Sequence, residues 1–141
     1  MNPEKKLISY LKGINREDGE VLQFGSYKPF TVTPIYEDET LIGVKTSNLE
    51  PSPFLPLDVF IVTIELLRSK MNNTAVKGKA MSGKLGSPEL PLDSVEGYVA
   101  LKVFGKKEGV HVFRKITPIS RILQQAGVCE NGRGYLRLLP N

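Results

Sequence analysis

Most of the side chains that could do chemistry in this sequence are of the kinds that bind nucleic acid. These candidates are Lys77, Lys79, Lys106, Lys107, Arg114, Lys115, Ser120, Arg121, Gln124, Gln125 and Arg133. Arginine can form two hydrogen bonds with the edge of guanine and glutamine two with adenine, whereas lysine and serine suit the phosphate backbone. We therefore predict base contacts from Arg121 and from Gln124 or Gln125. Arg133 is expected on a phosphate or in the minor groove, and the other candidates on phosphates.

Catalytic groups are scarce by comparison. His111 is the only histidine and lies in an alternating run where an exposed position is expected, and Cys129 is the only cysteine. A catalytic pair of these two residues stays open, but no third group that would orient it is evident. The acidic residues 37–39 could suggest a metal or nuclease site, although such a cluster at a hairpin tip is more often only solvated. We expect a protein that is not an enzyme and that binds no metal or cofactor.

The charge of the chain is unevenly distributed. Residues 1–70 contain 8 Lys/Arg and 10 Asp/Glu, a balance of −2, whereas residues 71–141 contain 11 and 5, a balance of +6. A basic surface raises the local concentration of polyanions and supports non-specific binding to phosphates. The second half is therefore the expected place of nucleic-acid binding.

Composition and length indicate a globular protein inside the cell. The 141 residues are 40% hydrophobic and 24% charged, which suits one domain with a core of its own. One cysteine and one histidine exclude an internal disulfide and a classical zinc cluster. Charges near the N-terminus argue against an export signal, and the longest apolar run, 59–67, is too short to span a membrane. We expect a cytoplasmic protein without membrane contact.

The last part of the chain predicts a helix followed by a tight basic hairpin. Thr117 is a suitable N-cap, Pro118 suits the first helical position, and Gly127 suits the left-handed end of the helix. Apolar residues recur between them at helical spacing and leave the polar candidates, Ser120 included, on the opposite face. Residues 128–139 then form two short extended runs around an Asn-Gly turn, which predicts a hairpin.

This combination resembles the closing half of a winged helix-turn-helix module, and residues 93–139 carry the resemblance. The resemblance implies that the helix enters the major groove of DNA while the hairpin, or wing, follows the backbone or the minor groove. The residues alone leave an alternative open. They also suit an ordinary amphipathic helix packed on a hairpin at the end of a small α+β domain.

Two further helices are expected before this segment. Residues 58–70 are apolar on most sides and predict a central core helix with Asp58 as its N-cap. The Ser-Pro-x-Leu-Pro-Leu-Asp motif at 52–58 recurs at 87–93, so we expect a second helix with Asp93 as its cap. The resulting order of three helices and a hairpin fits the resemblance.

Two segments of the second half are less determined. Residues 94–104 could pair with 110–116 as a hairpin instead of forming the second helix, because both runs are rich in strand formers. We favour the helix because the capping pattern and the repeated motif agree. Residues 72–86 contain lysines spaced by glycines and predict a flexible basic loop near a phosphate backbone, without the residue order of a P-loop.

The first half predicts a mixed arrangement. Residues 4–13 suit a short amphipathic helix, 20–25 a short strand, and 30–36 with 40–45 a hairpin in which Pro34 takes an edge or bulge position.

We predict an α+β fold with an N-terminal helix and β-hairpin appendage over 1–54 and a winged-helix-like domain over 55–141, or one compact domain overall. The predicted function is that of a small protein that binds double-stranded DNA, for example in transcription regulation. One alternative is a protein-interaction module, such as an inhibitor, immunity-type or subunit domain. Another is the non-catalytic part of a nucleic-acid-processing enzyme. A homodimer or a larger protein partner stays open.

Overall fold

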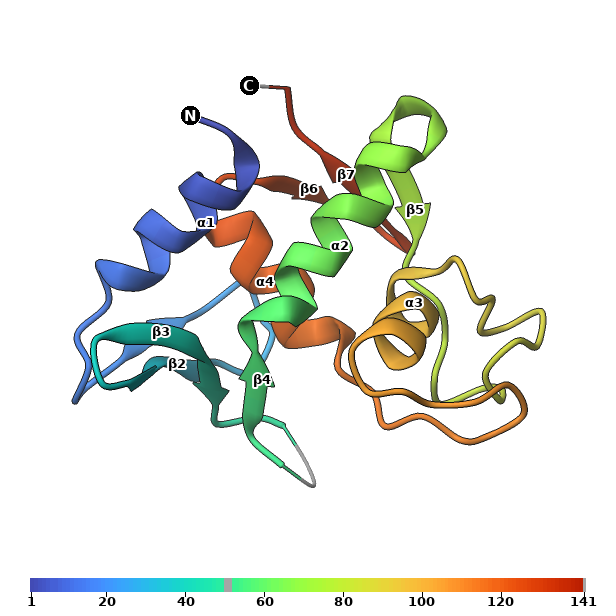
Figure 1. The fold of residues 1–141 in the computed structure, drawn as a ribbon, viewed down its shortest axis with the longest axis horizontal. Coiled ribbons are helices and arrows are strands. Elements are labelled where there is room, and N and C mark those ends of the chain that lie inside the picture. Colours follow the sequence, from blue (N-terminus) through green and yellow to red (C-terminus); the bar gives the residue numbers. More distant parts are fainter. Residues whose placement is uncertain (50–51, 141) are drawn as a thin grey trace.

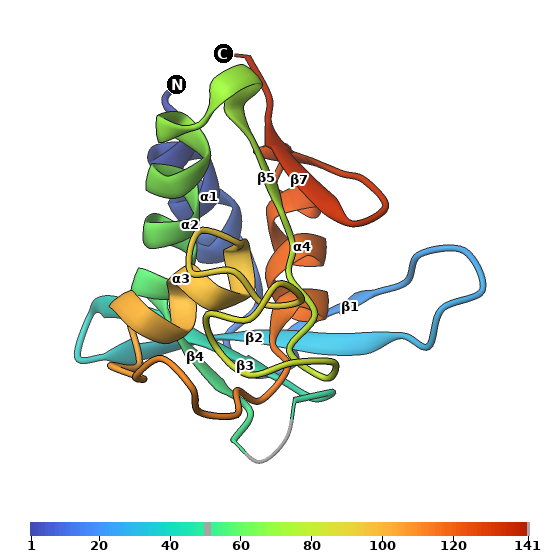
Figure 2. The same ribbon diagram turned by 90° about the vertical axis from the view of Figure 1, so that its right-hand side faces the viewer.

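The computed structural model describes residues 1–49 and 52–140 and confirms the α+β class (Figure 1). The described helices are α1 (Pro3–Lys12), α2 (Leu57–Ser69), α3 (Val95–Lys102) and α4 (Ile116–Gln125), with a 3₁₀ turn η1 at Met71–Asn73. The strands form two antiparallel sheets with the orders β1-β2-β3-β4 and β5-β7-β6. Figure 2 shows the first sheet across one end of the molecule and the second toward the end where both termini lie, with α4 between them. None of the described helices is long and apolar enough to cross a membrane.

The four-stranded sheet comes from the first half of the chain. Its strands are β1 (Glu20–Leu22), β2 (Phe30–Glu37), β3 (Thr40–Thr46) and β4 (Phe54–Pro56). The predicted β2–β3 hairpin is confirmed, whereas strand β4 was not predicted. β1 pairs only with the start of β2, so Pro34 is paired on the β3 side alone, and a bulge follows between Ile35 and Tyr36. Both features agree with the edge or bulge position expected for this proline.

The three-stranded sheet joins distant parts of the second half. Its strands are β5 (Thr74–Val76), β6 (Cys129–Asn131) and β7 (Tyr135–Leu138), with β7 in the middle. The β6–β7 hairpin confirms the prediction, and Gly134 in its turn has a φ of 81°, which glycine adopts without steric cost. Strand β5 was not predicted. Its residues 74–76 pair with 135–137 and thereby place the following lysine loop beside the hairpin.

Helix α2 is the central core helix, as predicted. Its buried residues are Val59, Phe60, Thr63, Ile64, Leu66 and Leu67. The Thr63 hydroxyl donates to the carbonyl of Val59 at 2.7 Å, which satisfies a buried polar group within the helix. Asp58 as N-cap is wrong, because the extended Pro56 directly precedes the helix and Asp58 lies in its first turn. The same core includes residues of α1, α3, α4 and both sheets, so it draws side chains from both sides of residue 54.

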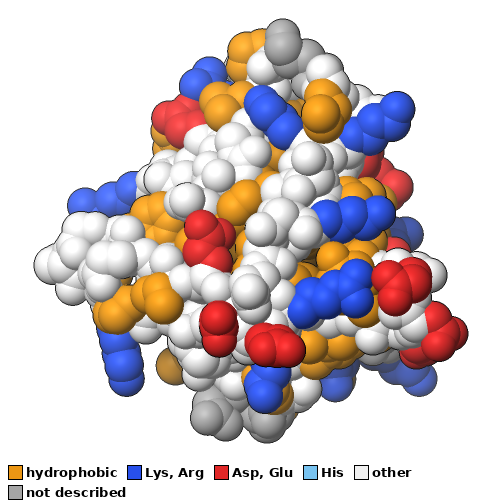
Figure 3. Space-filling model, turned by 90° about the vertical axis from the view of Figure 1, so that its left-hand side faces the viewer, with side chains coloured by type: hydrophobic (Ala, Val, Ile, Leu, Met, Phe, Trp, Pro, Cys, Tyr) orange, Lys and Arg blue, Asp and Glu red, His pale blue; other side chains and the backbone are white. Residues whose placement is uncertain are grey.

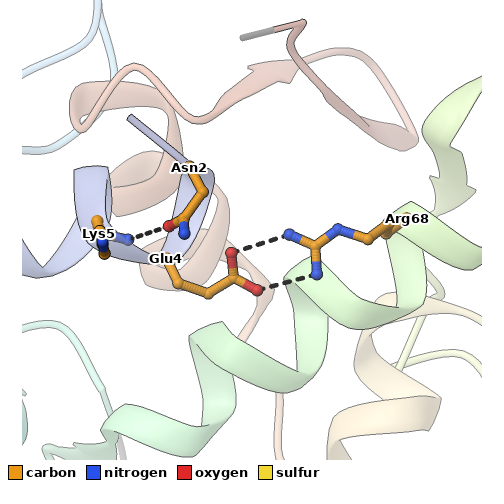
Figure 4. A network of polar contacts seen from close by, with 4 residues as sticks. All are labelled: Asn2, Glu4, Lys5 and Arg68. Atoms are coloured by element: carbon orange, nitrogen blue, oxygen red, sulfur yellow. Dashed lines mark hydrogen bonds and ion pairs between the residues drawn. The ribbon is translucent and has the colours of Figure 1, made fainter.

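An ion pair joins α1 to α2 near the termini (Figure 4). Arg68 donates to both carboxylate oxygens of Glu4, at 3.0 and 2.8 Å. This two-pronged geometry is the favourable one for a partly exposed pair. The side chain of Asn2 caps α1 by accepting from the backbone N–H of Lys5 at 2.8 Å. The predicted N-terminal helix is thus confirmed, with Gly13 just after its last residue.

Helix α3 is confirmed over 95–102, so the alternative hairpin is wrong. The N-cap of α3 differs from the prediction. The Ser94 hydroxyl accepts from the backbone N–H of Gly97 at 3.0 Å and serves as the N-cap. The chain turns just before this point, because Ser94 also donates to the carbonyl of Pro91 at 2.6 Å. Asp93 therefore stays outside the helix, where its carboxylate forms an ion pair with Lys70.

A second, smaller core holds the loop that follows β5. Ala80, Leu85, Leu90 and Ala100 are buried together between this loop and α3. The predicted loop, 72–86, is therefore packed against α3 through Ala80 and Leu85, which the spacing of its lysines and glycines did not indicate. The next connection, residues 103–115, contains no strand.

Candidate nucleic-acid interface

Helix α4 has the predicted apolar and polar faces, with one exception. Its buried apolar residues include Ile116, Ile119, Ile122 and Leu123. Gln124 and Gln125 are exposed and Arg121 is partly exposed. Ser120 is only 3% exposed and its hydroxyl donates to the carbonyl of Thr117 at 3.2 Å. The outward position expected for Ser120 is therefore wrong, because the serine lies at the edge of the buried stripe.

A buried carboxylate fixes the beginning of α4. The N-cap is Lys115, so Thr117 as N-cap and Pro118 as first helical residue are wrong. The backbone N–H of Lys115 donates to both carboxylate oxygens of Glu96 in α3, at 2.9 and 3.1 Å. Burial raises the pKa of Glu96 to about 7, and the hydrogen bond from Lys115 acts against this rise. At the other end, Gly127 has the predicted left-handed conformation, with a φ of 75°.

A hollow of about 820 Å³ lies beside α4. The positively charged side chains that line it are Lys77, Lys79, Arg114, Arg121 and Arg133, and no described carboxylate lines it. We call this site the basic hollow. Its cations come from the loop after β5, the connection before α4, α4 itself and the β6–β7 turn. Figure 2 shows that the β1–β2 connection and the β6–β7 turn project on the same side of the molecule, with α4 between them.

Lys77 is held in place by the second sheet. Its backbone N–H donates to the carbonyl of Gly134 at 2.9 Å, and its carbonyl accepts from the backbone N–H of Glu96 in α3 at 3.0 Å. Its ammonium donates to the side-chain oxygen of Asn131 on β6. Burial lowers the pKa of Lys77, and the nearby Arg121 and Arg114 lower it further. The basic hollow therefore concentrates positive charge, and none of the described ion pairs includes its cations.

Arg121 reaches across to the β1–β2 connection. Its guanidinium carbon lies 4.5 Å from the ring centroid of Phe24 and 4.4 Å from that of Tyr27. Cations over aromatic faces at this distance are attracted by the ring electrons. The contact orients the guanidinium inside the basic hollow and links the first half of the chain to α4. Neither aromatic residue was among the predicted candidates.

The hairpin keeps its own carboxylate away from its tip. Glu130 accepts from the hydroxyl of Tyr135 at 2.9 Å and from Arg137 Nε at 2.7 Å. Arg133 lies in the turn beyond these residues and is exposed. Among the described ion pairs, Glu130 is matched with Arg137 and not with Arg133. The tip of the hairpin is therefore available to an external anion.

The other six predicted contacts lie outside the lining of the basic hollow: Ser120, Gln124, Gln125, Lys106, Lys107 and Lys115. Gln124 lies at its border, because its side-chain oxygen accepts from Asn131 at 3.1 Å. Lys115 points elsewhere, since its ammonium donates to the carbonyl of Phe113 at 3.1 Å and lies 4.7 Å from the Phe104 ring centroid. Lys106 and Lys107 are exposed in the turn after α3.

The face on the left of Figure 1 carries side chains of several kinds. Figure 3 shows acidic and basic side chains intermixed there, with hydrophobic side chains between them. Interspersed charges of both signs are typical of a solvated surface. Charges of both signs therefore share this face.

The residues with possible catalytic chemistry do not form a site. Cys129 is buried and burial raises the pKa of its thiol to about 12, while His111 is exposed, as expected. The described residues contain no group of three or more His, Cys, Asp or Glu side chains that could hold a metal ion.

Sequence reasoning missed Phe24, Tyr27 and Asn131 as parts of the interface. A weak signal existed in Phe-Gly-Ser-Tyr-Lys-Pro at 24–29, where two aromatic residues flank a short polar turn beside a lysine. Comparisons with protein-family models, curated proteins and solved structures gave no match for this chain.

Proposed function

We propose that this chain is a DNA-binding protein that holds the phosphate backbone in the basic hollow. The observation that carries the proposal is the convergence of five cationic side chains from four segments on one concavity with no described carboxylate in its lining. Arginine and lysine on phosphates supply most of the affinity of non-specific DNA binding. A carboxylate of the protein could have neutralised each of these cations in an ion pair, yet none of the described ion pairs includes them.

The arrangement of the second half supports a winged-helix-like mode of binding. Helices α2, α3 and α4 precede the β6–β7 hairpin, and β5, which lies between α2 and α3, pairs with β7. In this mode α4 faces the DNA and the hairpin turn acts as the wing. The exposed Gln124 and Gln125 then provide base contacts and Arg133 contacts the backbone. Arg121, which is held against two aromatic rings, contacts a phosphate rather than a base edge.

The test is fluorescence-anisotropy binding to a mixed pool of DNA duplexes across a salt series. Each neutralised phosphate contributes a slope of about −0.9 to the plot of log affinity against log salt, so five contacts give up to about −4.5. The double variant Arg114→Ala/Arg133→Ala removes two exposed cations of the hollow. We expect weaker binding and a slope reduced in magnitude by about 2.

The matched control is Lys5→Ala/Lys12→Ala, which removes the same charge from exposed positions on α1. Its affinity and slope are expected to stay close to those of the wild type. If the two double variants weaken binding equally, the effect comes from the net charge of the protein and not from the basic hollow. No binding even at low salt would overturn the proposal and would favour a protein-docking role for this surface.

A further inference from the structure

The basic hollow has the size of a ligand pocket rather than of a surface that only follows a duplex. Pockets for small ligands typically enclose roughly 300–1,000 Å³, and this one encloses about 820 Å³. Loops border it on several sides: the β1–β2 connection, the loop after β5 and the β6–β7 turn. A paired base cannot enter such a concavity without leaving the duplex, whereas an unpaired nucleotide can.

The lining combines groups for a phosphate with a surface for a base. Lys77, Arg114 and Arg133 supply positive charge, and Asn131 supplies a side-chain amide held between Lys77 and Gln124. Tyr27 also lines the hollow and is 67% exposed. Exposed aromatic rings beside a positively charged groove are the usual means of holding single-stranded nucleic acid, because every base has a face that can stack.

The Tyr27 ring is oriented by its neighbours. The Arg121 guanidinium lies 4.4 Å from its centroid and 4.5 Å from that of Phe24, while the side chain of Gln23 donates to the carbonyls of Gly25 and Tyr27 at 3.0 and 2.6 Å. These contacts fix the turn that carries the ring. A large aromatic side chain is thereby kept exposed at the border of a cationic cavity, an arrangement that contributes little to the core.

We propose that the basic hollow binds an unpaired nucleotide of a DNA strand, such as a single-stranded extension of a duplex, with its phosphate on Lys77, Arg114 and Arg133 and its base stacked on Tyr27. This inference rests on the proposed function, because the adjoining duplex is held by α4 and the hairpin. The preferred ligand is therefore DNA with a junction between a duplex and a single strand.

The test compares a blunt duplex with the same duplex carrying a short 3′ or 5′ single-stranded extension, at a salt concentration where the blunt duplex is half bound. Stacking of one base contributes about a 5- to 150-fold gain in affinity, and we expect an extended duplex to bind more tightly within this range. Tyr27→Leu should abolish the gain, and Tyr27→Phe should keep it because the ring remains. Tyr36→Leu is the matched control, since Tyr36 stacks with Arg16, with 3.6 Å from the guanidinium carbon to the ring centroid, and does not line the hollow.

The outcomes separate the two proposals. Equal affinity for blunt and extended duplexes, with steep salt dependence for both, would overturn the unpaired-nucleotide site and leave duplex binding intact. A gain that survives Tyr27→Leu would also overturn it. Absence of binding to every duplex would refute both proposals. Binding of a free nucleoside monophosphate by a protein that ignores duplexes would likewise refute both, because it would assign the hollow to a small nucleotide.

Discussion

Glu96 gives the sharpest prediction about stability, because it is an acid buried between two helices. Its side chain is 2% exposed, and the backbone N–H of Lys115 donates to both of its oxygens. Burial raises its pKa from an ordinary value of 4.5 to about 7. Between these two pH values the folded protein keeps a proton on Glu96 that the unfolded chain has released. Its contribution to stability is therefore present below pH 4.5 and is lost as the pH rises toward 7.

The magnitude follows from the same two values. The interval between 4.5 and about 7, at about 1.4 kcal/mol per pH unit, gives a loss of about 3 kcal/mol. Glu96→Gln removes the titration and keeps an oxygen that can accept from Lys115. The difference in unfolding free energy between wild type and variant should therefore change by about 3 kcal/mol across this interval, in favour of the variant at higher pH.

Urea unfolding at a series of pH values measures this difference. Subtracting the unfolding free energies of Glu96→Gln from those of the wild type cancels the titration of all groups that the two proteins share. Glu89→Gln, at an exposed position, controls for the loss of a carboxylate. Glu4, Asp93 and Glu130 have lowered pKa values, so their contributions change below pH 4.5. A difference that stays flat between pH 4.5 and 7, or rises with pH, would refute the reasoning.

Three further outcomes are expected. Ser94→Ala should cost about 1 kcal/mol because it removes the cap of α3, whereas Asp93→Asn should change urea stability by less than about half of that, since its ion pair is exposed. Gly97→Ala should lower the melting temperature strongly, because an added Cβ would lie 2.0 Å from the carbonyl oxygen of Pro91. Gly13→Ala, where the nearest atom to an added Cβ lies at 3.4 Å, should be neutral or stabilising by up to about 1 kcal/mol. Cys129 should react with a thiol reagent only on unfolding, because burial suppresses its thiolate, and fast reaction of the native protein would contradict its buried position.

The elements that the sequence predicts well are those with strong local signals. The apolar stripe of α4, the terminating Gly127 and the Asn-Gly hairpin depend on neighbours only a few residues apart. The helix caps were placed less accurately, because Asp58, Asp93 and Thr117 are all good cap residues and the chain geometry selects others. Pro56 directly precedes α2, and the turn at Pro91 gives the cap of α3 to Ser94.

The missed features depend on partners far away in the chain. Strand β5 has only three residues and exists because β7, about 60 positions later, offers a ladder. Phe24 and Tyr27 matter because Arg121 packs against them, a contact that no pattern within either segment encodes. The candidate list contains the five cations that line the basic hollow but neither of these aromatic residues. The sequence shows these cations as separate clusters along the chain. The fold brings five of them, from four segments, to one hollow.

Three carboxylates of the basic half have partners of their own in the folded protein. Asp93 pairs with Lys70, Glu130 with Arg137, and Glu96 accepts from a backbone N–H. None of the three lines the basic hollow, although the charge of Arg114 acts on Glu96 and lowers its pKa against the effect of burial. Burial lowers the pKa of Lys77, and the positive charges of Arg121 and Arg114 lower it further. In the proposed function, a phosphate bound in the hollow would reduce the repulsion between Lys77 and these two arginines.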